Sequence, residues 1–175
     1  MTNDRVDSIL EDWRREAPDL DAWPIAVSER ISRLSTLLER QLEPVLARYD
    51  LSSGEFDVLA TLRRSGAPFQ LTPTILTTTL MVTSGGMTKR LSALERAELV
   101  RRVSNSEDRR SRAVELTDAG RELVERILES RLKNEKRMFG ALRKRQRRDL
   151  AAALRDLCVA LGDDQPSRKL TRGRG

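Results

Sequence analysis

The sequence contains no histidine and a single cysteine among its 175 residues. Histidine is the side chain that most often acts as a general base near neutral pH, and it is also the most common zinc ligand. Its absence excludes catalytic triads and zinc sites built on imidazole, and a lone Cys158 excludes a disulfide within one chain. The sequence also lacks a glycine-rich phosphate-binding loop. We therefore expect no enzyme activity, no catalytic residue, no metal site and no cofactor.

Long apolar runs are missing as well. Apolar residues make up 38% of the chain and aromatic residues 3%, and nothing approaches the roughly 20 consecutive apolar residues of a membrane-spanning helix. The first 13 residues, MTNDRVDSILEDW, mix acids with bases and do not resemble a secretory signal. These features predict a cytoplasmic protein with no membrane partner. With 34% charged residues, the chain has a modest core and favours burial against a second copy of itself.

Positive charge is in excess, with 33 Lys and Arg residues against 27 Asp and Glu residues and a formal net charge of +6. Such a balance favours a polyanionic partner. A basic protein without such a partner would have the same composition, so the charge alone leaves both interpretations open.

Helical periodicity dominates both ends of the chain. Apolar residues recur at helical spacing in residues 3–16, and a longer apolar stripe predicts a helix over residues 24–49. Pro44 lacks a backbone donor and predicts a kink there, or a break and a restart. Two more helices are expected, one after Thr117 and one that contains Cys158. Because Cys158 belongs to the apolar pattern of its helix, we expect it to be buried, with a redox switch as the alternative.

The centre of the chain has the pattern of a helix-turn-helix. Ser52 and Glu55 have capping-box spacing at the start of one helix, and Thr72 followed by Pro73 begins the next. A short turn then leads to a helix over residues 84–97. Two helices of about eight and about fourteen residues, joined by a short turn, are typical of this motif.

The helix over residues 84–97 has an inward apolar stripe and an open polar face. Gly85 and Gly86 in its first turn would each cost about 1 kcal/mol relative to alanine in an exposed helix. A helix end that must approach DNA closely gives a reason for such small residues, and a plain surface helix is the alternative. The candidate DNA-contacting residues of this helix are Ser84, Gly85, Gly86, Thr88 and Lys89.

Residues 100–104 and 112–116 alternate as two paired strands would, and a very short strand is expected at residues 69–71. Arginines on a hairpin suit insertion into the minor groove of DNA, although a solvated charged face is the alternative. The arginines of this hairpin are Arg101, Arg102, Arg109, Arg110 and Arg112. Asp108 is close enough to Arg110 to orient its guanidinium, so Asp108, Arg109 and Arg110 complete the candidate DNA contacts.

One motif resembles a known family. Asp108, Arg110, Val114, Leu116, Thr117 and Gly120 match the pattern D-x-R-x₃-V-x-L-T-x-x-G, which resembles the winged-helix core of the MarR family of bacterial transcription regulators. The similarity covers roughly residues 30–135. The resemblance implies a mainly α fold with a small β-hairpin wing, and a homodimer whose N- and C-terminal helices intertwine. Such dimers bind a pseudo-palindromic double-stranded DNA operator, usually as repressors that a small ligand releases.

A finer resemblance concerns the ligand. The first helix, and the run L-T-P-T-x-L before S-G-G-M-T-x-R, look like the urate-responsive subfamily. That resemblance implies an anion site formed by Trp13, Asp57, Arg90 and Arg102. Two guanidiniums would hold a small organic anion such as urate or a related planar or carboxylate anion, and an indole would stack on it. Asp57 would pair with an arginine in the empty site. Alternatively, Trp13 is a core residue, Asp57 is solvated, and the two arginines contact phosphates.

The sequence thus predicts four segments. Residues 1–50 form the extra helix and a dimerisation helix, residues 51–117 the winged helix-turn-helix lobe, residues 118–162 the C-terminal dimerisation helices, and residues 163–175 a basic disordered tail. The function expected is that of a ligand-responsive DNA-binding regulator. The alternative is an architectural DNA-binding protein that responds to no ligand.

Overall fold

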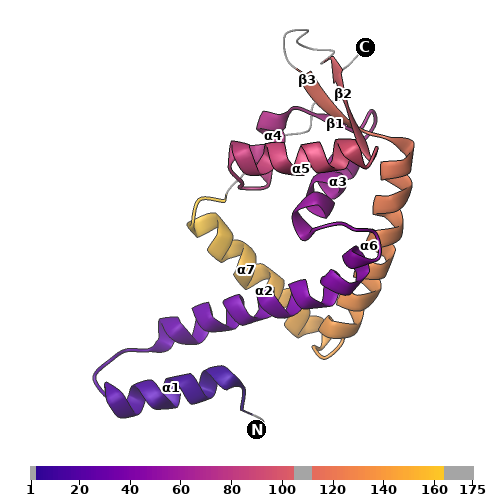
Figure 1. The fold of residues 1–175 in the computed structure, drawn as a ribbon. Helices are drawn as coiled ribbons and strands as arrows, with labels where there is room; N and C mark the ends of the chain where they lie inside the picture. Colours follow the sequence, from indigo (N-terminus) through magenta and orange to yellow (C-terminus); the bar gives the residue numbers. More distant parts are fainter. Residues whose placement is uncertain (1–2, 105–111, 164–175) are drawn as a thin grey trace.

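The computed structural model describes residues 3–104 and 112–163 of the chain. This part of the chain is mainly helical, with one small antiparallel sheet at one end (Figure 1). Its elements, in chain order, are α1 (Arg5–Glu16), α2 (Trp23–Ala47), α3 (Ser53–Arg64), β1 (Gln70–Leu71), α4 (Pro73–Thr79), α5 (Ser84–Arg96), β2 (Val100–Ser104), β3 (Arg112–Leu116), α6 (Asp118–Phe139) and α7 (Lys144–Ala160).

The helix-turn-helix begins with side-chain caps that the sequence predicts. The Ser52 hydroxyl accepts a hydrogen bond from the Glu55 amide, and the Glu55 carboxylate accepts one from the Ser52 amide at 2.8 Å. Thr72 caps α4 with Pro73 at its first position, as predicted, and the structure adds a cap at Thr83 for α5. Helices α4 and α5 therefore form the predicted pair.

The sheet has the strand order β1-β3-β2, and all pairs are antiparallel. Strands β2 and β3 have the bounds expected from sequence, with Arg102 opposite Val114. The expected very short strand is present as β1, where Gln70 lies opposite Glu115. The β2–β3 hairpin extends beyond the helices as the wing (Figure 1).

A single apolar cluster joins α3, α4, α5, the sheet and the first half of α6. This packing fixes α5 and the wing against the same core, so the two candidate DNA-contacting elements share one rigid support. Its largest fully buried members are Phe56, Leu59, Leu62, Leu76, Met87, Leu91, Leu94 and Ile127.

The start of α6 lies at very short range from Leu99, in the turn between α5 and β2. The Thr117 amide donates to the Leu99 carbonyl oxygen at 3.1 Å, and the Thr117 hydroxyl lies 2.8 Å from the Glu98 carbonyl oxygen and 3.1 Å from that of Leu99. One turn later, a Cβ on Gly120 would lie well inside van der Waals contact with the same oxygen. Thr117 and Gly120 thus hold α6 onto the backbone of Leu99, which gives a physical reason for the L-T-x-x-G part of the sequence motif.

Helix α2 is unbroken from Trp23 to Ala47 although Pro44 lies inside it. Of the two alternatives expected there, the break and restart is wrong, and the kink stays a prediction. Proline removes one helix hydrogen bond. Leu42 and Val45 pack against the core on both sides of Pro44, and Leu46 is buried. Tertiary packing therefore keeps this last turn helical.

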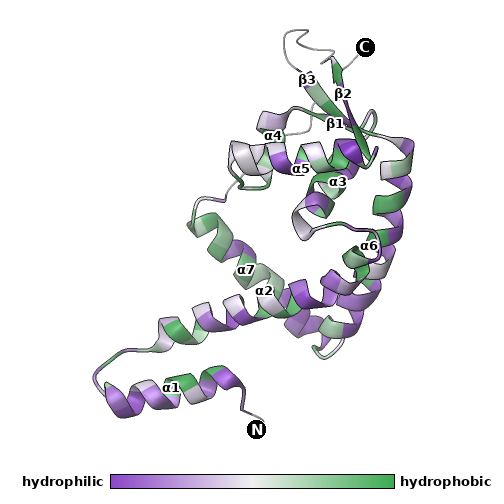
Figure 2. Ribbon diagram, in the orientation of Figure 1, coloured by the Kyte–Doolittle hydropathy of each residue, from purple (hydrophilic) through white to green (hydrophobic). Residues whose placement is uncertain are grey.

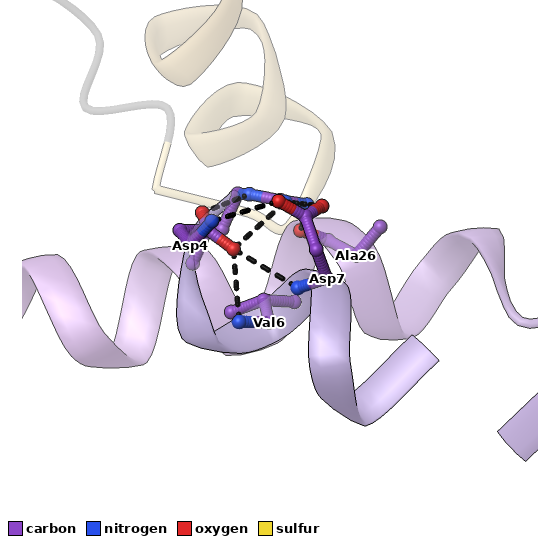
Figure 3. Close-up of polar contacts among 5 residues, drawn as sticks. Asp4, Val6, Asp7 and Ala26 are labelled. Carbon is purple, nitrogen blue, oxygen red and sulfur yellow. Dashed lines mark hydrogen bonds and ion pairs between the residues drawn. The ribbon is translucent and has the colours of Figure 1, made fainter. Parts of the chain in front are cut away.

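Helix α1 lies along the first half of α2 (Figure 1). Val6 and Leu10 are buried, and Arg30 of α2 forms ion pairs with Asp4 at 2.8 Å and Asp7 at 2.7 Å (Figure 3). The hydrogen bond from Arg30 lowers the pKa of Asp4. All three charged side chains are at least 36% exposed, and exposed pairs contribute little. Burial of the two apolar residues therefore does most to hold α1 in place.

Helix α7 has no buried residue in the single chain. Cys158 is exposed, so the expectation that it is buried is wrong for one chain alone. An apolar row runs along this helix, and a second one runs along the first half of α2 (Figure 2). The exposed members of these rows are Leu150, Leu154, Leu157 and Leu161 on α7, and Trp23, Val27, Ile31 and Leu34 on α2. Within the described ranges, no helix combines the length and the apolar character needed to cross a membrane.

Candidate nucleic-acid interface and ligand site

Helix α5 presents the polar face that the sequence predicts. Its apolar stripe is buried, because Met87, Leu91 and Leu94 are each at most 2% exposed. The first turn is open to solvent, with Gly86 half-buried and Ser84, Gly85, Thr88 and Lys89 exposed. Helix N-termini carry partial positive charge and free amide groups. This turn therefore offers donors and positive charge to an anionic partner.

The two glycines of this turn differ in what the fold requires of them. A Cβ on Gly86 would meet the Thr83 hydroxyl oxygen at 3.3 Å, whereas a Cβ on Gly85 would meet nothing within 4 Å. Gly85 also lies in an ordinary helical turn, where glycine costs stability. Neither packing nor backbone conformation explains Gly85, and its contact with DNA stays a prediction.

The base of the wing is tied down by ion pairs. Arg101 binds Glu115 across the β2–β3 pair, and the Arg102 Nε lies 2.7 Å from a Glu95 carboxylate oxygen on α5. Arg112 is exposed. Three candidate DNA contacts, Asp108, Arg109 and Arg110, lie outside the described residues.

The structure brings two of the four candidate ligand residues together. Arg90 of α5 lies against the start of α3, where a Cβ on Gly54 would be 2.5 Å from the guanidinium carbon. Asp57 lies one turn further along α3. Burial raises the pKa of Asp57, and the charges of Arg131 and Arg90 partly oppose that rise. In the described part of the chain, no ion pair to Asp57 is formed within 4 Å, so the expected pairing with an arginine is absent.

A cavity of about 250 Å³ lies beside Asp57, between α2, α3 and α6. The polar lining of this cavity includes Arg131, which pairs with Glu135 at 2.7 Å. The guanidinium carbon of Arg131 is 5.7 Å from the centre of the Phe56 ring. Asn134 and Ser53 also line it. Sequence reasoning missed Arg131, and the spacing of Arg131 and Glu135 on one helix was the only available signal.

The other two candidate ligand residues lie elsewhere. Arg102 is on β2 and is held by Glu95 at the far end of α5. Trp13 is 43% exposed on α1, and the length of α2 separates α1 from α5 (Figure 1). A single chain therefore places Asp57 and Arg90 in one region but does not enclose a ligand with all four residues.

The half-buried Asp57 gives a pH-dependent prediction. Folding raises the pKa of Asp57 above its ordinary value of 3.8. The ionisation of Asp57 therefore lowers the free energy of unfolding as pH rises from that value through the folded-state pKa. Asp57→Asn should therefore become more stable than the original protein as pH rises from about 4 to 7. Urea unfolding across this range measures the difference. The same substitution at the exposed Asp19 is the control, and a constant offset for Asp57→Asn would contradict the prediction.

Comparison with known proteins identifies the family. The MarR family profile matches residues 49–111. The HTH-type transcriptional regulator PecS of Dickeya dadantii (strain 3937) is 40% identical over 149 residues, which cover 85% of this chain and 90% of PecS. The chain belongs to the MarR family. It is a transcriptional regulator and not an enzyme.

Solved structures of this family share the fold. The MarR family transcriptional regulator Sco5413 from Streptomyces coelicolor matches with a TM-score of 0.70 at 26% identity, over 82% of this chain and 98% of its own. A mutant MarR from E. coli complexed with operator DNA matches with a TM-score of 0.69 at 24% identity, over 79% of this chain and 98% of its own. The predicted mainly α, winged helix-turn-helix fold is therefore confirmed.

Proposed function

We propose that this MarR-family regulator is a homodimeric repressor that binds a pseudo-palindromic double-stranded DNA operator and releases it when a small organic anion binds. The observation that carries the DNA-binding part is the open first turn of α5, where Gly85 has no role in packing. This turn shares a core with an arginine-bearing wing. A helix that enters the major groove beside a wing at the minor groove accounts for both features.

The exposed apolar rows of α2 and α7 support the homodimer. Each row has helical spacing and leaves large apolar side chains in solvent in the single chain. Contiguous apolar surface of this kind is typical of an interface. A second copy that packs on these helices would bury both rows and place two α5 helices on one face. The half-sites would then lie about 34–36 Å apart, one turn of B-DNA.

The ligand part of the proposal rests on Asp57 and Arg90, which meet where α3 touches α5. An anion that binds the Arg90 guanidinium would draw it away from Gly54 and disturb α5. Ionised Asp57 would repel that anion, so its raised pKa favours entry. In the proposed site, Arg102 gives up its ion pair with Glu95 and binds the ligand instead. The indole of Trp13 reaches the site through the dimer or by movement of α1.

Titration of an operator complex with urate tests the ligand proposal. Urate should dissociate the complex and quench tryptophan emission, and Trp13→Phe should remove most of the quenching while the exposed Trp23 still emits. Arg102→Ala should leave operator binding largely intact and raise the urate concentration needed for release, because a charge-assisted contact is worth about 1.5–3 kcal/mol. Arg90→Ala should weaken both activities.

Two outcomes would count against this ligand site. Unchanged anion affinity in both the Trp13→Phe and Arg102→Ala proteins, measured by isothermal titration calorimetry, would place the ligand elsewhere. Operator complexes that persist at saturating concentrations of urate and of other planar or carboxylate anions would favour an architectural DNA-binding protein instead.

A further inference from the structure

The corner between α6 and α7 carries the highest density of positive charge in the described chain. We call it the basic corner, and it consists of Lys133, Lys136, Arg137, Arg143, Lys144, Arg145, Arg147 and Arg148. The only carboxylates between residues 133 and 149 are Glu135 and Asp149, so this stretch has a formal charge of +6. The net charge of the whole chain is also +6. The rest of the molecule is therefore neutral on balance.

The two carboxylates do little to neutralise the basic corner. Glu135 pairs with Arg131, which is outside it. Asp149 lies 3.5 Å from Arg145 and 3.7 Å from Arg148, whose side chains are 86% and 79% exposed. In the described ranges, no carboxylate lies within 4 Å of the other six cationic groups. Most of this charge thus faces solvent.

The dipole of α6 favours Lys136 and Arg137, which lie in the last turn of that helix, but the cations that begin α7 are in the opposite situation. Cationic side chains at a helix N-terminus face the positive end of the helix dipole, which disfavours them. The first turn of α7 contains no acidic residue, and three of its four residues are cationic: Lys144, Arg145 and Arg147. A local choice that opposes helix stability suggests that the basic corner serves an external partner.

The position of the basic corner separates it from the proposed operator-binding face. The wing lies at one end of the molecule, and the turn between α6 and α7 lies at the opposite end (Figure 1). Burial of so many like charges between two copies would carry a large desolvation penalty. The basic corner would therefore remain in solvent in an operator-bound dimer.

We propose that the basic corner binds the phosphate backbone of a second DNA duplex, so that one dimer can bridge two segments of DNA. The inference rests on the proposed operator binding by α5 and the wing. Arginine supplies five of its eight cations, and its planar fork of donors suits phosphate oxygens. An anionic membrane would need an apolar face beside the charges. The apolar row of α7 is assigned here to the dimer interface.

A sandwich capture assay tests the bridge. The full chain is bound to an immobilised operator, and capture of a labelled duplex of unrelated sequence is measured at low salt. The original protein should retain the second duplex, and added salt should release it. The triple variant Arg145→Gln, Arg147→Gln and Arg148→Gln should reduce capture by about tenfold or more, since each lost phosphate contact weakens binding. Its operator affinity should change by less than about twofold.

A matched control removes three exposed charges elsewhere, with Arg5→Gln, Arg14→Gln and Arg126→Gln, and should capture the second duplex as the original protein does. Equal loss in both triple variants, or no loss in the first, would overturn the proposal. Binding to vesicles of phosphatidylcholine and phosphatidylserine without capture of a second duplex would overturn it in favour of a membrane surface. If the original protein does not bind the operator, the proposed function fails separately. The basic corner is then judged by binding to the unrelated duplex alone.

Discussion

Gly120→Ala should lower the free energy of unfolding by about 3 kcal/mol, the upper part of the range for a forced overpacking. The added methyl would collide with the carbonyl oxygen of Leu99, which also accepts the hydrogen bond from the Thr117 amide. Backbone atoms cannot rotate away as a flexible side chain can. Relief would require α6 to separate from the turn that contains Leu99, which would disturb the core and the Thr117 hydrogen bond together. Urea unfolding followed by circular dichroism measures the loss.

Gly85→Ala is the matched control for this prediction. A methyl at Gly85 meets nothing within 4 Å, and alanine is favoured over glycine in a helix by about 1 kcal/mol or less. The variant should therefore be as stable as the original protein or more stable, yet it should bind the operator more weakly if α5 approaches DNA there. Similar losses of stability in the two variants would show that the collision with the Leu99 carbonyl oxygen is not the cause.

Leu154→Glu combined with Leu157→Glu should dissociate the proposed dimer and weaken operator binding by about 100-fold or more, because two linked half-sites are reduced to one. Both side chains are about 40% exposed in the single chain, so a monomer could keep the new carboxylates in water. The same carboxylates would be buried and unpaired in a dimer. Light scattering and operator titration on the same samples measure the two effects.

The control for this prediction changes the charge of α7 by the same amount on another side. Arg148→Gln with Arg155→Gln should leave a dimer with nearly unchanged operator affinity. A dimeric Leu154→Glu, Leu157→Glu protein would show that copies associate through other surfaces. A monomeric protein with full operator affinity would show that DNA binding does not need the dimer.

The winged lobe could be predicted from the sequence because its signals are local. Ser52, Thr72 and Thr83 cap their own helices, so a few neighbouring residues suffice to locate each helix start. The bounds of β2 and β3 likewise match the two five-residue segments that the sequence predicts as strands. Such short-range chemistry depends little on the rest of the fold.

The parts that could not be predicted depend on contacts between distant segments. Pro44 is tolerated because its neighbours pack on the core, and periodicity alone cannot weigh that packing against a lost hydrogen bond. Arg90 rests on Gly54, a contact between helices 36 positions apart in sequence. Cys158 fits an apolar row, but whether such a row faces its own chain or a second copy is not encoded in its spacing. The same ambiguity affects Trp13.

The attachment of α6 at Leu99 makes this helix a lever. Its 22 residues, at about 1.5 Å each, extend roughly 33 Å from the DNA-binding lobe to the basic corner. If the C-terminal half is held in a dimer, a tilt of about 10° at Gly120 would move the lobe by several ångströms over a helix of this length. The pitch of B-DNA allows little error in the separation of two α5 helices. A ligand would therefore need only to change the angle at which α6 leaves the lobe, without unfolding either part.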